Sequence, residues 1–159
     1  MVNKIKLTFL GTGGMIPTES RNHPAFFLNY DGEGILVDCG EGTQLQFRKA
    51  RLSPSKITRI LLTHRHGDHT FGIPGLFRTL AMSGYKKNLM IYGPGKIKKV
   101  IDGIFEAFGS TTEYKISVQE ASEKFFETKD FFLDAEKMTH GQLCNAYSFN
   151  LKGKIRIDK

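Results

Sequence analysis

The sequence predicts an α/β protein in which strands alternate with helices in layers. Short apolar runs rich in β-branched and aromatic residues, bounded by glycine and proline, are typical of strands. Apolar residues from 97 to 108 recur at helical spacing instead, and Gly109 follows where a helix commonly ends. With 159 residues, of which 40% are hydrophobic and 25% charged, the chain has the composition of one globular domain.

The elements of the first part of the chain follow from local signals. A strand over 5–10 ends at a glycine-rich turn, and two further strands over 25–30 and 34–38 are joined by Asp31-Gly32-Glu33-Gly34, a hairpin signal. A helix is expected from Thr43, because Gln46 three residues later gives a capping-box pattern. We expect its apolar contacts to come from Leu45, Phe47 and Ala50.

The rest of the chain alternates strands and helices before ending in strands. A buried strand over 57–62 leads into a polar loop over 64–69, and glycine and proline interrupt a helix over 73–82. The remaining predicted elements are a strand over 89–92, a helix over 96–108, and strands over 115–119, 125–127, 131–138 and 146–151.

Composition excludes several classes of protein. No apolar run approaches the ~20 residues that span a bilayer, and the first residues lack the apolar stretch of a signal peptide. The only cysteines are Cys39 and Cys144, so a disulfide framework is not expected. We therefore expect a cytoplasmic location.

Charge is unevenly distributed over a chain whose net charge is +7. Residues 42–67 hold six basic residues and no acid, whereas residues 102–136 hold nine acids and three lysines. Further basic residues gather at 86–99 and in the tail, at Lys152, Lys154, Arg156 and Lys159. This asymmetry favours a face for an anionic partner, and a solvated basic surface is the alternative.

The segment Thr63-His64-Arg65-His66-Gly67-Asp68-His69 carries the clearest chemistry, because four potential metal ligands lie within it. His64 and His66 can point to one side, and Asp68 and His69 to another. Two metal ions about 3.5–4 Å apart can use all four, and imidazole with carboxylate suits zinc, with manganese or iron as alternatives. An ordinary polar loop is the alternative. Open metal positions that hold a hydroxide would give metal-assisted hydrolysis, and the basic surface favours a phosphodiester substrate.

His64-x-His66-x-Asp68-His69 resembles the signature of the metallo-β-lactamase superfamily. The sequence motifs around it resemble those of ribonuclease Z, the endonuclease that removes 3′ trailers from precursor tRNA. They run in order along the chain: Gly11-Thr12-Gly13, Pro17-Thr18-Glu19-Ser20-Arg21-Asn22, Val37-Asp38-Cys39-Gly40-Glu41-Gly42-Thr43-Gln44 and Gly72-Ile73-Pro74-Gly75-Leu76. The resemblance implies a four-layer αββα sandwich, present here as roughly its N-terminal half, and a zinc-dependent cut that leaves a tRNA 3′-hydroxyl.

The resemblance also assigns site residues. His64 and His66, with His140, would bind one zinc, and Asp68 and His69 the other. Asp68 would also be the catalytic proton acceptor, which requires an oxygen that is not occupied by metal. His140 alone, before a glycine at a strand end, would read as a loop residue.

Three further residues are weaker candidates. Asp38 ends a strand, where its carboxylate could orient a ligand histidine, and a simple turn residue is the alternative. Arg21 and Asn22 resemble a substrate-contacting loop, in which arginine would grip phosphate, and a surface turn held by Asn22 is the alternative.

The family's site needs two more ligands, a shared carboxylate and a last histidine, which come from the second half of its fold. Residues 1–159 are therefore expected to be the N-terminal part of a single domain, without the C-terminal half and the tRNA-binding arm. The expected partners are precursor tRNA, the C-terminal half and a second copy in a homodimer, with no membrane. The isolated chain is expected to be inactive. The alternatives are a non-catalytic or split subunit, or another metallo-phosphodiesterase of the superfamily.

Overall fold

A computed structural model describes residues 4–109 and 113–153, so the basic tail residues Lys154, Arg156 and Lys159 lie outside the described residues. The strands are β1 (Lys6–Gly11), β2 (Ala25–Tyr30), β3 (Glu33–Val37), β4 (Arg59–Leu61), β5 (Leu89–Gly93), β6 (Ile116–Glu120), β7 (Glu123–Glu127), β8 (Phe131–His140) and β9 (Gln142–Leu151). The helices are α1 (Thr43–Lys49), η1 (Pro54–Lys56), α2 (Gly67–Thr70), α3 (Ile73–Met82) and α4 (Ile97–Phe108).

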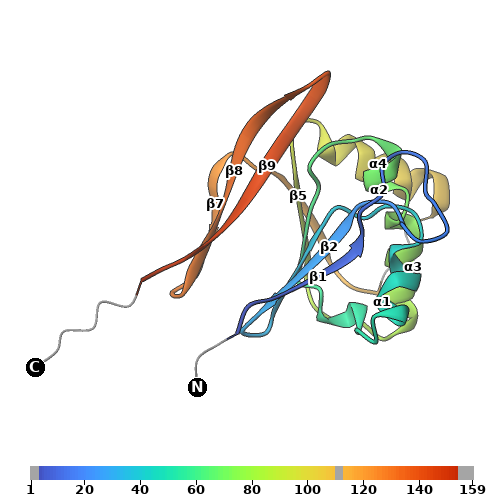
Figure 1. Ribbon diagram of the computed structural model, residues 1–159, viewed down its shortest axis with the longest axis horizontal. Helices are drawn as coiled ribbons and strands as arrows, with labels where there is room; N and C mark the ends of the chain where they lie inside the picture. Colours follow the sequence, from blue (N-terminus) through green and yellow to red (C-terminus); the bar gives the residue numbers. More distant parts are fainter. Residues whose placement is uncertain (1–3, 110–112, 154–159) are drawn as a thin grey trace, which may run out of the picture.

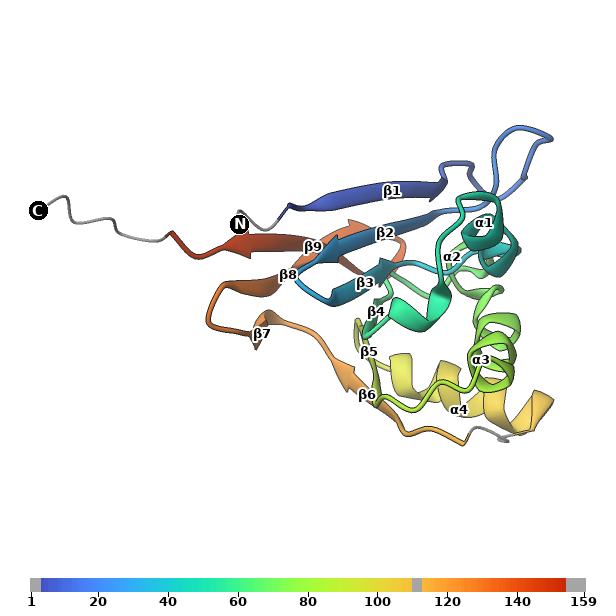
Figure 2. The same ribbon diagram turned by 90° about the horizontal axis from the view of Figure 1, so that it is seen from below.

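The strands form two sheets. The larger has the order β1-β2-β3-β4-β5-β6, antiparallel from β1 to β3 and parallel from β3 to β6, and the smaller is the antiparallel set β7-β8-β9. Helices cover one face of the larger sheet and the smaller sheet packs on the other (Figures 1 and 2). The described residues therefore form three layers, α, β and β, and the α/β prediction is confirmed.

Each interface between layers has its own apolar core. One core joins the helices to the larger sheet and includes Phe27, Leu36, Phe47 and Leu76. The other lies between the sheets, where Tyr30 of β2 meets Phe149 of β9 with ring centroids 5.5 Å apart. This contact places β9 above β2, one strand away from β1.

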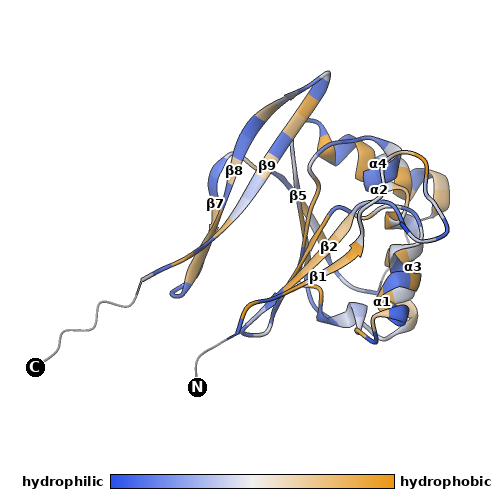
Figure 3. Ribbon diagram, viewed as in Figure 1, coloured by the Kyte–Doolittle hydropathy of each residue, from blue (hydrophilic) through white to orange (hydrophobic). Residues whose placement is uncertain are grey.

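The outer strand β1 is left partly uncovered. Leu7 pairs with Leu28, and Phe9 with Phe26, and directly opposed residues share a face of a sheet. Leu28 packs against the core between the sheets, so this is the face toward β9. Leu7 and Phe9 nevertheless remain 50% and 64% exposed, and Figure 3 shows the apolar end of β1.

Most predicted elements are present within a few residues of their expected bounds. The hairpin between β2 and β3 turns through Asp31 and Gly32, both at positive φ, as a type I′ turn requires. The second part of the predicted loop 64–69 is instead the short helix α2.

The predicted capping box at α1 is wrong. Gly42, in the left-handed region at φ 74°, precedes the helix, and no side chain caps it. The Thr43 hydroxyl donates to the carbonyl of Gly40 instead, at 2.6 Å. Phe47 is buried as expected, whereas Leu45 and Ala50 are exposed, because only one narrow face of α1 meets the sheet.

Helix α4 has nearly the predicted bounds, but the fold covers only part of its apolar stripe. Ile97 and Ile101 are buried against the sheet, whereas Val100 and Ile104 are only half-buried and Phe108 is exposed. Its apolar surface is therefore wider than the surface that the fold covers.

Candidate metal centre

The loop that follows β4 positions the first histidines. Two backbone hydrogen bonds join this loop and β4 to the segment that follows β3. The Asp38 N–H donates to the Leu61 carbonyl and the Cys39 N–H donates to the His69 carbonyl, both at 2.8 Å. Glycines allow this close packing, since a Cβ on Gly40 would lie 2.3 Å from His23 Cβ and 2.4 Å from the Asp68 carbonyl oxygen. The segment 38–42 and the metal motif thus hold each other in place.

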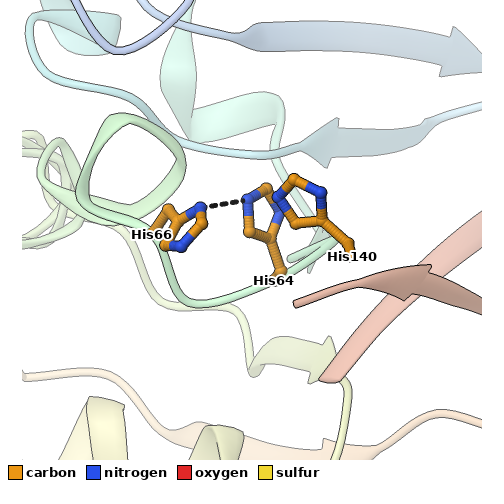
Figure 4. Close-up of side chains that lie close together, drawn as sticks. All are labelled: His64, His66 and His140. Carbon is orange, nitrogen blue, oxygen red and sulfur yellow. Dashed lines mark hydrogen bonds between the residues drawn. The ribbon is translucent and has the colours of Figure 1, made fainter. Parts of the chain in front are cut away.

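Three histidines from distant parts of the chain converge at this loop. One ring nitrogen each from His64, His66 and His140 lies within 4.8 Å of the others. His64 and His66 come from the loop, and His140 reaches them from the end of β8 (Figure 4). His64 Nε2 and His66 Nδ1 are 3.0 Å apart, and the rings of His64 and His140 are centred 4.6 Å apart.

The smaller sheet is fastened to the same loop, which explains how His140 is placed. Asn145 N–H donates to the Thr63 carbonyl and the Tyr147 hydroxyl donates to the Leu62 carbonyl, both at 2.8 Å. Gly141 between β8 and β9 has φ 56°, which favours glycine and permits the tight turn after His140.

The second predicted ligand pair lies beside the three histidines. His69 Nε2 is 3.5 Å from Asp68 Oδ2, and the His69 and His64 rings are centred 4.0 Å apart. Asp68 is 6% exposed, and its Oδ1 is buried without a hydrogen-bond partner among the described residues. A buried, unpartnered carboxylate oxygen among histidines is what a metal or a proton would satisfy. The five predicted ligands are therefore brought together, and their individual roles stay predictions.

Asp38 lies behind these ligands. Its Oδ2 is 2.7 Å from His69 Nδ1, and its Oδ1 accepts a hydrogen bond from Thr63 N–H at 2.8 Å. This geometry leaves His69 Nε2 directed away from Asp38 and available as a ligand atom.

Thr63 is a residue that the sequence reasoning missed. Its hydroxyl oxygen lies 2.9 Å from Asp38 Oδ2, 2.9 Å from His64 Nδ1 and 3.4 Å from His69 Nδ1. It thus connects the two ligand groups. Its place directly before His64, at the end of a buried strand, was the signal that could have found it.

The electrostatics suit metal binding at neutral pH. Burial, with the neighbouring His69, lowers the pKa of His64 to about 4, so its ring is neutral and able to ligate. Burial also acts to lower the pKa of His69, but the hydrogen bond with Asp38 and the charges of Asp38 and Asp68 outweigh it and raise that pKa. Burial raises the pKa of the Cys39 thiol to about 12, so the metal-free thiol is neutral at neutral pH.

Replacing Asp38 by asparagine should lower the pKa of His69. The charge and the hydrogen bond that raise this pKa would be lost, and the effect of burial would remain. NMR titration of the ring protons in metal-free protein measures the shift. Asp31→Asn, in the exposed hairpin turn, is the matched control and should leave His69 unchanged. An unaltered His69 pKa in Asp38→Asn would contradict the coupling.

Arg21 and Asn22 are placed in the loop before β2. The Asn22 amide donates to the Glu41 carbonyl at 2.7 Å, and the Gly13 N–H donates to the Asn22 carbonyl at 2.8 Å, so Asn22 holds the turn. Arg21 is exposed and lines a cavity of about 410 Å³ together with Lys49. Their predicted substrate contacts stay predictions.

Two further findings concern the cysteines and the helices. Cys39 and Cys144 are both free thiols. Across residues 4–109 and 113–153, no helix combines the length and apolar character needed to cross a membrane.

Sequence comparison places the chain among known proteins. It is 42% identical over 158 residues to a ribonuclease Z of Methanococcus maripaludis, covering 97% of this chain and 51% of that protein. Over 150 residues it is 41% identical to the ribonuclease Z of Nanoarchaeum equitans, covering 94% and 48%. The chain therefore spans about half the length of the curated relatives it matches, and it is homologous to their N-terminal half.

Solved structures agree on the fold. Human tRNase Z, short form, is 31% identical, with a TM-score of 0.85 over 93% of this chain and 66% of its own. A metallo-β-lactamase fold protein from Bacillus subtilis, 20% identical, gives a TM-score of 0.74 and shows the fold alone. The predicted metallo-β-lactamase fold is thus confirmed as a partial one.

A family model described as Anti-Pycsar protein Apyc1 matches residues 5–155. That range includes every element from β1 to β9 and all five candidate ligands. The chain thus belongs to this family, and it is a ribonuclease Z homologue that carries part of the metallo-β-lactamase fold.

Proposed function

We propose that this chain is the metal-binding half of a zinc-dependent endoribonuclease that removes 3′ trailers from precursor tRNA. The observation that carries the proposal is the convergence of His64, His66 and His140 beside Asp68 in a homologue of ribonuclease Z. Imidazole nitrogens with a carboxylate are a donor set that zinc accepts, and manganese is a possible substitute. A cytoplasmic site of action is part of the proposal.

The roles of the residues follow from their positions. His64, His66 and His140 would hold one zinc, and Asp68 and His69 would contribute to the second. Bound zinc would lower the pKa of a water molecule and polarise the scissile phosphate. Asp68 has one oxygen near His69 and a second, Oδ1, without a partner among the described residues, so a proton can be held there and passed to the departing 3′-oxygen of the tRNA.

The proposal includes the C-terminal half as a partner. It would supply the shared carboxylate and the last histidine, and the structure offers it a surface. Strand β9 pairs only with β8 among the described strands. The exposed Leu7 and Phe9 lie on the face of β1 that is directed toward the smaller sheet. Because neighbouring strands lie about 4.8 Å apart, a strand added to β9 would cover β1.

The decisive experiment is cleavage of precursor tRNA by the purified chain with zinc or manganese. We expect no cleavage by the chain alone and cleavage, leaving a tRNA 3′-hydroxyl, once the C-terminal half of a relative is added. Binding of tRNA should weaken steeply with salt, as expected for phosphate contacts by a chain of net charge +7.

Other outcomes would contradict the proposal. No cleavage with the added half would favour a non-catalytic subunit. Cleavage of a small phosphodiester such as bis(p-nitrophenyl) phosphate, without cleavage of tRNA, would favour another metallo-phosphodiesterase. A homodimer is also proposed, and sedimentation of the reconstituted enzyme tests it.

A further inference from the structure

A groove on the helical side, next to the metal-binding loop, has no part in the centre described above. Its volume is about 530 Å³, within the range of small-ligand sites. Residues of the metal-binding loop and of α4 both line it. The lining includes Glu41, Arg65, Phe71, Pro74, Ile104 and Phe108.

Phe71 gives this groove an exposed aromatic ring that lies against the metal-binding loop. Its side chain is 65% exposed. One part of the ring nevertheless rests on the metal-binding loop, because a Cβ on Gly67 would lie 2.1 Å from the Phe71 ring atom Cζ. Gly67 stands between His66 and Asp68, so the ring is held against the segment that carries the ligands. An exposed aromatic ring in the lining of a groove is suited to stack on a nucleobase.

Two charged side chains, Arg65 and Glu41, line the groove. Arg65 lies between His64 and His66, and its Nε is buried without a hydrogen-bond partner in the described ranges. Glu41 is exposed, and no ion pair joins it to Arg65 in the described part of the chain. Guanidinium groups match phosphate, and carboxylates accept hydrogen bonds from the amino groups of bases.

We propose that this groove binds one nucleotide of a single-stranded RNA segment. The base stacks on Phe71, the phosphate contacts Arg65, and Glu41 accepts a hydrogen bond from an exocyclic amino group of the base. The inference rests on the proposed function, because an RNA strand that leaves the metal centre beside His66 would pass Arg65. The charge also favours RNA over a second copy of this chain, which carries the same +7.

The test is fluorescence anisotropy with a labelled ten-nucleotide single-stranded RNA and the full chain, with EDTA present. Phe71→Ala should weaken binding about tenfold or more, the usual effect of losing one stacked base, and Phe71→Tyr should retain it. Arg65→Ala should weaken binding and make it less salt-dependent. Met82→Ala is the matched control, because Met82 is 89% exposed at the end of α3 and away from the groove.

The outcomes separate this inference from its alternatives. RNA affinity unchanged in both Phe71→Ala and Arg65→Ala would overturn it. So would a dimer of the unmodified chain, seen by sedimentation, that Phe71→Ala dissociates, since the groove would then join two copies. Unfolding midpoints show whether each variant folds. Because EDTA removes catalysis, RNA binding can succeed here even if the cleavage assay fails, and the reverse also holds.

Discussion

His66→Ala should abolish tight zinc binding by the isolated chain. His66 is one of three histidines whose ring nitrogens converge at the first metal position. Loss of an outer-shell partner already costs 10–100-fold in metal affinity, so loss of a ligand should cost more than about 100-fold. Isothermal titration with zinc measures the affinity and the stoichiometry.

Stability provides a second measurement of the same effect. At a free zinc concentration of 100 times the Kd, binding would stabilise the unmodified chain by about 2.7 kcal/mol, and His66→Ala should lose this gain. Because His66 is exposed, the His66→Ala variant and the unmodified chain should have the same free energy of unfolding when EDTA is present. His69→Ala, which leaves the three-histidine group intact, should retain one zinc. Unchanged zinc stoichiometry and affinity in His66→Ala would refute the assignment.

Gly40→Ala should destabilise the chain by about 3 kcal/mol, the upper part of the usual range for overpacking. The added methyl group would meet His23 Cβ at 2.3 Å and the Asp68 carbonyl oxygen at 2.4 Å, and backbone atoms cannot rotate away as a flexible side chain can. The same displacement should move Asp68 from its position beside His69. Urea denaturation of metal-free protein measures the free energy of unfolding.

Gly14→Ala is the matched control. Beyond its chain neighbours, no atom of the described residues lies within 4 Å of the position that a Cβ would take there, and its φ is not in the left-handed region. We expect this variant to have the same free energy of unfolding as the unmodified chain. Equal stability of the Gly40→Ala and Gly14→Ala variants would show that the segment 38–42 can yield, and that close packing does not hold the metal motif.

Local signals predicted much of the fold and the loop part of the site. The helix over 73–82 has the expected bounds, and the His64–His69 ligands are close because they are close in sequence. His140 was different. Its approach depends on the packing of the smaller sheet through Asn145 and Tyr147, which no local pattern shows, and only the family resemblance pointed to it.

The failed capping box shows what a local pattern leaves out. The pattern of Thr43 and Gln46 takes account of a single helix alone. In the structure, the Thr43 hydroxyl donates to the Gly40 carbonyl, and the Gln46 N–H donates to the Gly42 carbonyl. The layers cover only part of α4. Packing between the layers decides how much of an apolar stripe is covered, so the exposure of Phe108 required the structure.

The uncovered strand face has a consequence for handling the isolated chain. Strand β9 has one edge that pairs with no other described strand, and β1 carries exposed apolar side chains. Open strand edges of this kind template intermolecular pairing. Self-association of this kind rises with concentration and leads toward amyloid-like stacking. The solubility of the isolated chain should therefore depend more on protein concentration than on temperature. Co-expression with a polypeptide that covers this surface should raise the soluble yield.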